Sequence, residues 1–287
     1  MRVRGRVNTG QIEDRRGSRG GRTGLAVGGG GLGIAGVVLA LVLTLAGGGD
    51  GSAALDALRD LQAPTGATQD SEPLECPNGA DTSNACFVAA VVNDVQATWT
   101  DIFRSEGRNY DNTKLVLFTD ATTSGCGQAS SATGPFYCPA DSKVFLDLGF
   151  FQELRDRFGA PGDFAQAYVI AHEFGHHVQN LLGTSDRVAR EEQRGGDAAR
   201  EASIALELQA DCYAGIWAHE TEVQPDPQDF DEALDAAAAV GDDRLQKQAG
   251  QRVNRETWTH GSSAQRMQWF RTGADSGDPS ACDMFSS

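Results

Sequence analysis

The stretch His172-Glu173-Phe174-Gly175-His176 constrains this chain of 287 residues more than any other. On a helix, two histidines four residues apart project from the same face, so both imidazoles can bind one metal ion. The Glu173 carboxylate, next to the first histidine, can take a proton from a metal-bound water without being a ligand. The alternative is two core histidines beside a surface carboxylate. With five histidines in the whole chain, the pattern is rare by chance.

The residues around this motif predict a helix between Asp163 and Gly183. Apolar side chains recur there at steps of three and four residues, as on the buried face of a helix. Asp163 is the expected N-cap, and Gly183 is the expected C-terminal stop. The apolar residues are Phe164, Ala167, Tyr168, Ala171, Phe174, Val178 and Leu182. The histidines flank this apolar stripe.

A second helix is predicted over residues 198–220, and it carries Glu207 and Asp211 one turn apart. A catalytic zinc needs three protein ligands and an open position for water, so Glu207 is predicted to be the third ligand. Asp211 is predicted to accept a hydrogen bond from the free N–H of a liganding histidine and to fix its tautomer. Without the histidine motif, two acids on a helix would indicate a solvated face.

The net charge of −16 is unevenly distributed along the chain. Residues 1–23 contain seven arginines against Glu13 and Asp14, a net charge of +5, so the other residues carry −21. A body this acidic argues against nucleic acid as a partner.

Residues 24–49 contain no charged side chain. At about 1.5 Å per helical residue, this stretch is long enough to cross a bilayer core of ~30 Å. Because the arginines precede it, we predict a single-pass protein of the cell membrane with residues 1–23 in the cytoplasm. Residues 50–75 would then form a flexible linker, and residues 76–287 an extracytoplasmic metallopeptidase domain. A cleaved signal peptide is the alternative, although no clear Ala-x-Ala site follows the apolar run.

All six cysteines follow the apolar stretch, and an even number on the oxidising side of a membrane indicates disulfides. Short separations favour Cys76 with Cys86 and Cys126 with Cys138, which leaves Cys212 for Cys282. Six cysteines allow 15 complete connectivities. A cysteine-based zinc site is the alternative, but the chain contains no Cys-x-x-Cys.

The remaining patterns predict a mainly helical α+β domain with a small antiparallel sheet, after the membrane helix. A peptide could add to an edge of that sheet in extended form, or the strands could serve only the core. We expect a solvated loop or a frayed helix end at 184–196. The other expected elements are a helix at 84–104, strands at 114–119 and 142–148 joined by a loop at 120–139, and a helical pair at 225–250.

Several motifs resemble the neutral zinc metallopeptidases of bacteria, which are single-pass membrane proteins of the gluzincin type. The matching segments are 12–17, 134–141, 172–176, 207–211, 259–263 and 277–282. More remotely, the chain resembles gluzincins that cleave membrane and secretory proteins, which share Glu-x-x-x-Asp on the second helix. Those enzymes have Thr-His-Pro before the last helix, whereas Gly261 replaces the proline here. The resemblance implies a zincin-like fold and a peptidase, but not its substrates.

His260 lies in a turn before a helix that Ser262 or Ser263 can cap. Such a turn can present an imidazole to a cleft, where its N–H could stabilise an oxyanion. A surface or capping histidine is the alternative. Arg266, within that helix, is expected either to face the substrate or to hold an acidic side chain.

We therefore predict a zinc-dependent metalloendopeptidase acting on a peptide or protein substrate. One Zn²⁺ would be held by His172, His176 and Glu207, with Glu173 as general base. Two alternatives stay open: a zinc-binding, non-catalytic module of the cell envelope, and a zinc amidase acting on peptidoglycan.

Overall fold

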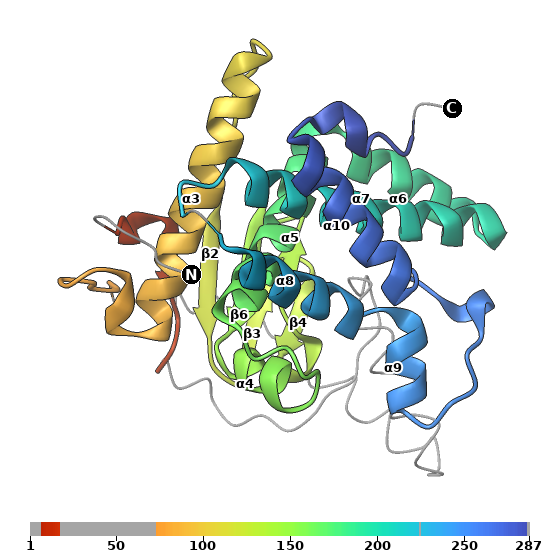
Figure 1. Cartoon of the computed structure of the whole chain (residues 1–287), viewed down its shortest axis with the longest axis horizontal. Helices are drawn as coiled ribbons and strands as arrows, with labels where there is room; N and C mark the ends of the chain where they lie inside the picture. The colour runs from red at the N-terminus through yellow and green to blue at the C-terminus, as the bar shows by residue number, and fades with distance from the viewer. Residues whose placement is uncertain (1–6, 18–72, 224, 286–287) are drawn as a thin grey trace, which may run out of the picture.

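The computed structural model describes residues 7–17, 73–223 and 225–285, and it shows helices packed around a small sheet (Figure 1). Helix α5 (Asp163–Leu182) runs through the centre and contacts α3 (Asn84–Ser105), α7 (Gly196–Glu220) and α8 (Pro227–Ala239). Because the His172–His176 motif lies on α5, its surroundings are set by the core of the domain.

The main sheet has four strands in the order β1-β2-β6-β5. Their bounds are Ile12–Asp14 for β1, Lys114–Phe118 for β2, Phe136–Cys138 for β5 and Lys143–Asp147 for β6. β1 pairs parallel with β2, and β2 pairs parallel with β6, whereas β5 is antiparallel to β6. A separate antiparallel hairpin joins β3 (Ala121–Ser124) to β4 (Gly127–Ser130).

The prediction of a small antiparallel sheet was therefore wrong for the main sheet, which is mixed. Between β2 and β6 the chain inserts a hairpin and then β5, so β6 runs in the same direction as β2. β1 was not expected at all, because its three residues carry two acids and no alternating apolar pattern.

The other elements complete a mainly helical domain. Helix α4 was not predicted. Helix α6 lies where we expected a solvated loop or a frayed helix end, because its sequence is strongly polar and only Val188 is buried. The further bounds are α4 Gly149–Asp156, α6 Thr184–Arg194, α9 Asp242–Gln248 and α10 Ser263–Ser276, with short 3-10 turns at Thr9–Gln11, Ala80–Thr82, Ser131–Thr133, Arg255–Thr257 and Pro279–Cys282.

Helix α5 forms where its apolar periodicity indicates. Its N-cap is Gly162, so Asp163 is the first helical residue, where its negative charge favours the helix N-terminus. It ends at Gly183, whose φ of 78° is the left-handed conformation that glycine adopts without strain. Phe164, Tyr168 and Phe174 are almost fully buried on this helix.

The predicted single-pass membrane topology was wrong. Residues 24–49 lie outside the described residues, and no helix in the described ranges is long and apolar enough to span a bilayer. Moreover, β1 lies in residues 1–23, which we assigned to the cytoplasm, whereas β2 lies in the domain that we assigned to the outside. The two strands nevertheless pair in one sheet. Strands of one sheet cannot lie on opposite sides of a bilayer.

Three disulfides link the six cysteines: Cys76 to Cys86, Cys126 to Cys138, and Cys212 to Cys282. These are the pairs that the sequence separations favoured. The first ties the segment before α3 to that helix, and the second joins the hairpin turn to β5. The third attaches the C-terminal segment to α7, one residue after Asp211.

Candidate metal centre

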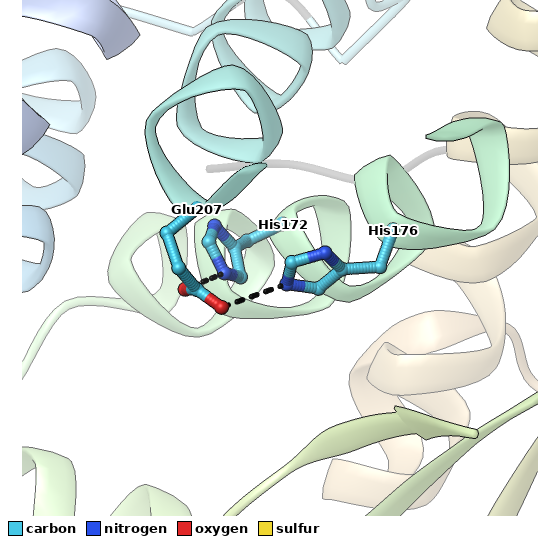
Figure 2. A group of neighbouring side chains, drawn as sticks. All are labelled: His172, His176 and Glu207. Carbon is cyan, nitrogen blue, oxygen red and sulfur yellow. Dashed lines mark ion pairs between the residues drawn. The ribbon is translucent and has the colours of Figure 1, made fainter. Parts of the chain in front are cut away.

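Three predicted ligands converge where α7 crosses α5 (Figure 2). The Nε2 atom of His172 lies 3.4 Å from Oε2 of Glu207, and the Nε2 atom of His176 lies 3.5 Å from Oε1. His172 and Glu207 are buried, and His176 is partly exposed. One side of the site is therefore open to solvent.

The donor set fits a zinc ion. Two atoms that are each about 2.1 Å from a tetrahedral metal lie about 3.4 Å apart, which matches both nitrogen–oxygen separations. Two imidazoles and one carboxylate are also the ligands of a catalytic rather than a structural zinc site, because they leave a coordination position open.

Close backbone packing brings Glu207 to the histidines. A Cβ atom at Gly175, between the two histidines in sequence, would lie only 3.0 Å from the carbonyl oxygen of Ala210 on α7. A larger residue at Gly175 would push α7 outward and move Glu207 away from His172 and His176. The close approach of α7 to α5 thus explains why a glycine is needed at position 175.

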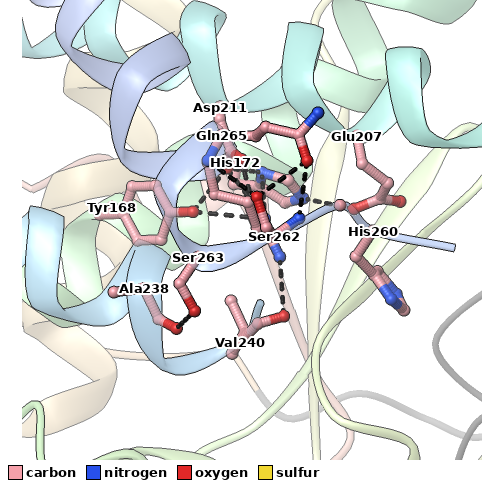
Figure 3. Close-up of polar contacts among 12 residues, drawn as sticks. Tyr168, His172, Glu207, Asp211, Ala238, Val240, His260, Ser262, Ser263 and Gln265 are labelled. Atoms are coloured by element: carbon pink, nitrogen blue, oxygen red, sulfur yellow. Dashed lines mark hydrogen bonds and ion pairs between the residues drawn. The ribbon is translucent and has the colours of Figure 1, made fainter. Parts of the chain in front are cut away.

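Asp211 receives four hydrogen bonds behind His172 (Figure 3). Its Oδ1 accepts from Nδ1 of His172 at 2.9 Å, from the Tyr168 hydroxyl at 2.5 Å and from Nη2 of Arg266 at 2.8 Å. Its Oδ2 accepts from Nε of Arg266 at 2.7 Å. These bonds leave Nε2 of His172 as the nitrogen that faces Glu207.

The charges in this network determine its protonation. Burial alone would raise the pKa of Asp211, but Arg266 and His172 outweigh burial and lower it. Burial alone would lower the pKa of His172, yet Asp211 raises it to about 9 in the metal-free chain. A metal ion must therefore displace a proton from His172 at neutral pH.

His176 is held from behind by a neutral group. Its Nδ1 lies 2.8 Å from Oε1 of Gln179, which is fully buried one turn along α5. In both histidines, Nδ1 is hydrogen-bonded to a side chain of the protein and Nε2 faces Glu207. Gln179 and Tyr168 were not predicted to support the histidines, although they lie three and four residues from His176 and His172 on the same helix.

Glu173 is only 8% exposed, and its carboxylate has no hydrogen-bond partner within the described ranges. Burial raises its pKa, an effect that the neighbouring His172 and His176 partly offset. Glu207 differs: burial would raise its pKa, but His176 and His172, helped by His260, hold it well below the usual value. The two glutamates are thus in electrostatically different environments.

His260 lies close enough to Glu207 to influence its pKa, and it is held by Asp242 at the start of α9. Oδ2 of Asp242 accepts the backbone N–H groups of Thr259, His260 and Gly261 at 2.7–3.0 Å. Its Oδ1 lies 3.2 Å from Nδ1 of His260. Asp242 was not predicted to contact His260, because nothing in the sequence distinguishes it from the other acidic residues of that region.

The remaining buried histidine has a structural setting. His177 lies between the Tyr137 hydroxyl, 3.1 Å from Nδ1, and the carbonyl oxygen of Asp111, 2.7 Å from Nε2. Both ring nitrogens are used, and burial lowers the pKa of this imidazole. His177 therefore joins α5 to β5 and lies outside the metal centre.

A His-Glu-x-x-His helix with a third carboxylate from the next long helix defines the gluzincin class of zinc site. The comparisons with known proteins give a zinc metallopeptidase family. The chain belongs to the family described as "Putative neutral zinc metallopeptidase", whose model matches residues 1–285.

Relatives of this chain occur in bacteria. The uncharacterized protein YpfJ of Escherichia coli K12 is 42% identical over 292 residues, which cover 99% of each chain. The uncharacterized proteins Mb2605 of Mycobacterium bovis and Rv2575 of Mycobacterium tuberculosis are each 45% identical over 227 residues, which cover 74% of this chain and 75% of theirs. No solved structure gives a significant match.

Proposed function

We propose that the protein is a zinc-dependent endopeptidase in which His172, His176 and Glu207 hold one zinc ion. The observation that carries this proposal is the convergence of two Nε2 atoms on one carboxylate, while both Nδ1 atoms are held from behind. A zinc ion bound there would lower the pKa of a coordinated water and polarise a substrate carbonyl.

Glu173 acts as the general base in this proposal. Its buried carboxylate is free of hydrogen bonds to the described residues, so it can accept the water proton and later transfer it to the leaving amine. A neutral glutamine at this position would keep the shape of the site but could not accept the proton.

His260 is proposed to donate a hydrogen bond to the oxyanion that forms on the substrate. Because Asp242 lies at its Nδ1, the imidazole is oriented with Nε2 directed away from Asp242. A fixed donor of this kind stabilises charge that develops in the transition state without having to reorganise.

The substrate backbone is proposed to lie along β5. This strand is at the edge of the sheet, and its Tyr137 contacts His177, the residue after His176. An extended peptide could add to such an edge through main-chain hydrogen bonds. This arrangement would favour unfolded or extended protein segments as substrates.

The test is hydrolysis by the purified full-length chain loaded with one equivalent of zinc. We expect cleavage of casein that stops with a chelator, returns with zinc and is absent in Glu173→Gln. Cleavage of cell-wall fragments but not of casein would instead indicate an amidase. Zinc binding without hydrolysis of either substrate would indicate a non-catalytic zinc module.

A further inference from the structure

The side-chain amide of Gln179 can have only one orientation in this structure. Its Nε2 lies 2.6 Å from the carbonyl oxygen of Leu206 and 3.1 Å from Oε1 of Gln209. Both of those atoms are acceptors, so the nitrogen must point toward them and the oxygen toward Nδ1 of His176. The proton of a neutral His176 is thereby placed on Nδ1, which leaves the Nε2 lone pair for a metal.

The same amide also connects two ligand-bearing helices. Leu206 precedes Glu207 on α7, whereas Gln179 and His176 lie on α5. One buried side chain therefore sets the ring orientation of one ligand and contacts the backbone beside another.

Gln209 accepts a hydrogen bond from the Gln179 amide and is itself held by the C-terminal segment. Its Nε2 donates to the carbonyl oxygen of Cys282 at 3.0 Å, and Cys282 is joined to α7 through Cys212. Gln209 is also buried, but its hydrogen bonds go to Gln179 and Cys282. It is therefore a matched control, because it is an amide of the same kind that holds Gln179 without touching His176.

We propose that Gln179 is the positioning residue for His176 and fixes the tautomer in which this histidine can bind zinc. The inference rests on the proposed function, in which His176 is a ligand. His172 has a charged partner in Asp211 for the same purpose, whereas His176 relies on a neutral amide. The two histidines are thus unequal donors, with His172 the more electron-rich.

Three full-length variants separate positioning from simple packing. Gln179→Met keeps the bulk but removes the acceptor, Gln179→Glu keeps the acceptor but loses the donor to Leu206, and Gln209→Met removes only the support. Should Gln179→Met not fold, the double variant Gln179→Met/Gln209→Met removes both amides and avoids leaving one unpaired.

Two readouts are needed, and the first requires no metal. Ring-nitrogen NMR shifts of metal-free protein, at alkaline pH where imidazoles are neutral, report the His176 tautomer. We expect a single Nδ1–H tautomer in the wild type, Gln179→Glu and Gln209→Met, and a mixture in Gln179→Met. Chelator competition then measures zinc affinity, which should fall about 10–100-fold in Gln179→Met. In Gln209→Met only the thermal stability should fall.

An unchanged tautomer in Gln179→Met would overturn the proposal, and so would equal losses of zinc affinity in Gln179→Met and Gln209→Met. A wild-type chain that shows the expected tautomer but binds no zinc would refute the proposed function instead. The cobalt(II) absorption spectrum gives an independent check, because a reoriented His176 changes the ligand field whereas a loosened core does not.

Discussion

Arg266 binds both carboxylate oxygens of Asp211, through Nε at 2.7 Å and Nη2 at 2.8 Å, and both side chains are almost completely buried. The planar guanidinium suits this two-point contact, which a lysine ammonium cannot reproduce. In this structure the arginine holds an acidic side chain, which is one of the two roles expected for Arg266. It also connects α10 to the support of His172.

Arg266→Met should destabilise the metal-free protein by about 3–5 kcal/mol, because it leaves the Asp211 charge buried without its partner. Arg266→Lys should recover only part of this loss. The double variant Arg266→Met/Asp211→Asn should be more stable than Arg266→Met alone. Urea unfolding of the metal-free variants measures these differences, and equal stability of Arg266→Met and wild type would contradict the assignment.

The two glutamates should separate metal binding from turnover. Glu207→Ala should lose most of the bound zinc, because two protein ligands are left where three are needed. Glu173→Gln should keep the zinc and lose hydrolysis. Metal analysis together with a peptidase assay tests both expectations, and full zinc occupancy in Glu207→Ala would refute its role.

His260→Ala should keep zinc content and stability near wild type while kcat falls by roughly 10²-fold, the usual loss for one oxyanion donor. His260→Phe should be no better, because it restores bulk without a donor. Asp242→Asn should lower kcat as well, because it weakens the hydrogen bonds from the backbone N–H groups of residues 259–261 to this side chain. Asp243→Asn is the control, since Asp243 binds Ser263 rather than His260. An unchanged kcat in His260→Ala would remove the residue from the mechanism.

Glu13 on β1 should contribute a pH-dependent part of the stability. Burial opposes its charge, but hydrogen bonds from Lys143 and Arg15 outweigh burial and lower its pKa below 4.5. The contribution is therefore present above about pH 4.5 and is lost as the pH falls through the folded-state pKa. The melting temperature of Glu13→Gln should be below wild type at neutral pH, and the difference should shrink in acid. A constant difference at every pH would indicate that the ion pairs are not its cause.

The disulfide between Cys126 and Cys138 should stabilise the domain by about 2–4 kcal/mol, because it restricts a loop of small residues in the unfolded chain. Replacing both cysteines with alanine should lower the melting temperature without changing zinc affinity, since neither residue lies at the metal centre. Two free thiols at these positions in non-reduced protein would show that the bond is absent.

The helices could be predicted where the apolar periodicity is clear, although the N-cap of α5 is Gly162 and not the expected Asp163. α3, α5, α7 and α10 all carry an apolar face, and Ser262 caps α10 with its side chain as its position before the helix indicates. α6 has only Val188 buried, so its polar sequence was interpreted as a solvated loop or a frayed helix end. The strand β1 is fixed by its pairing with a distant strand and by ion pairs, neither of which is a local signal.

Spacing alone pointed to the three candidate ligands, which lie together in the structure, and to one supporting residue, Asp211. Asp211 was expected behind a histidine because it lies one turn from Glu207. Asp242 supports His260 from a different helix, a relationship that only the packing of α9 against the 259–261 loop creates. Asp211 lies on the same helix as Glu207, so spacing pointed to it, whereas Asp242 reaches His260 only through tertiary contacts, which no spacing in the sequence indicates.

The parallel pairing of β1 with β2 has a consequence for how the chain folds. Ile12 leaves the ribosome about a hundred residues before its partner Leu115. β1 therefore cannot pair until β2 has been synthesised. Until the two strands pair, the β1 segment is open to other chains, and so is the edge of β2 once β2 has been made. Because such long-range contacts slow folding, closing this edge should be a late step, and the aggregation-prone period of synthesis should last until it is complete.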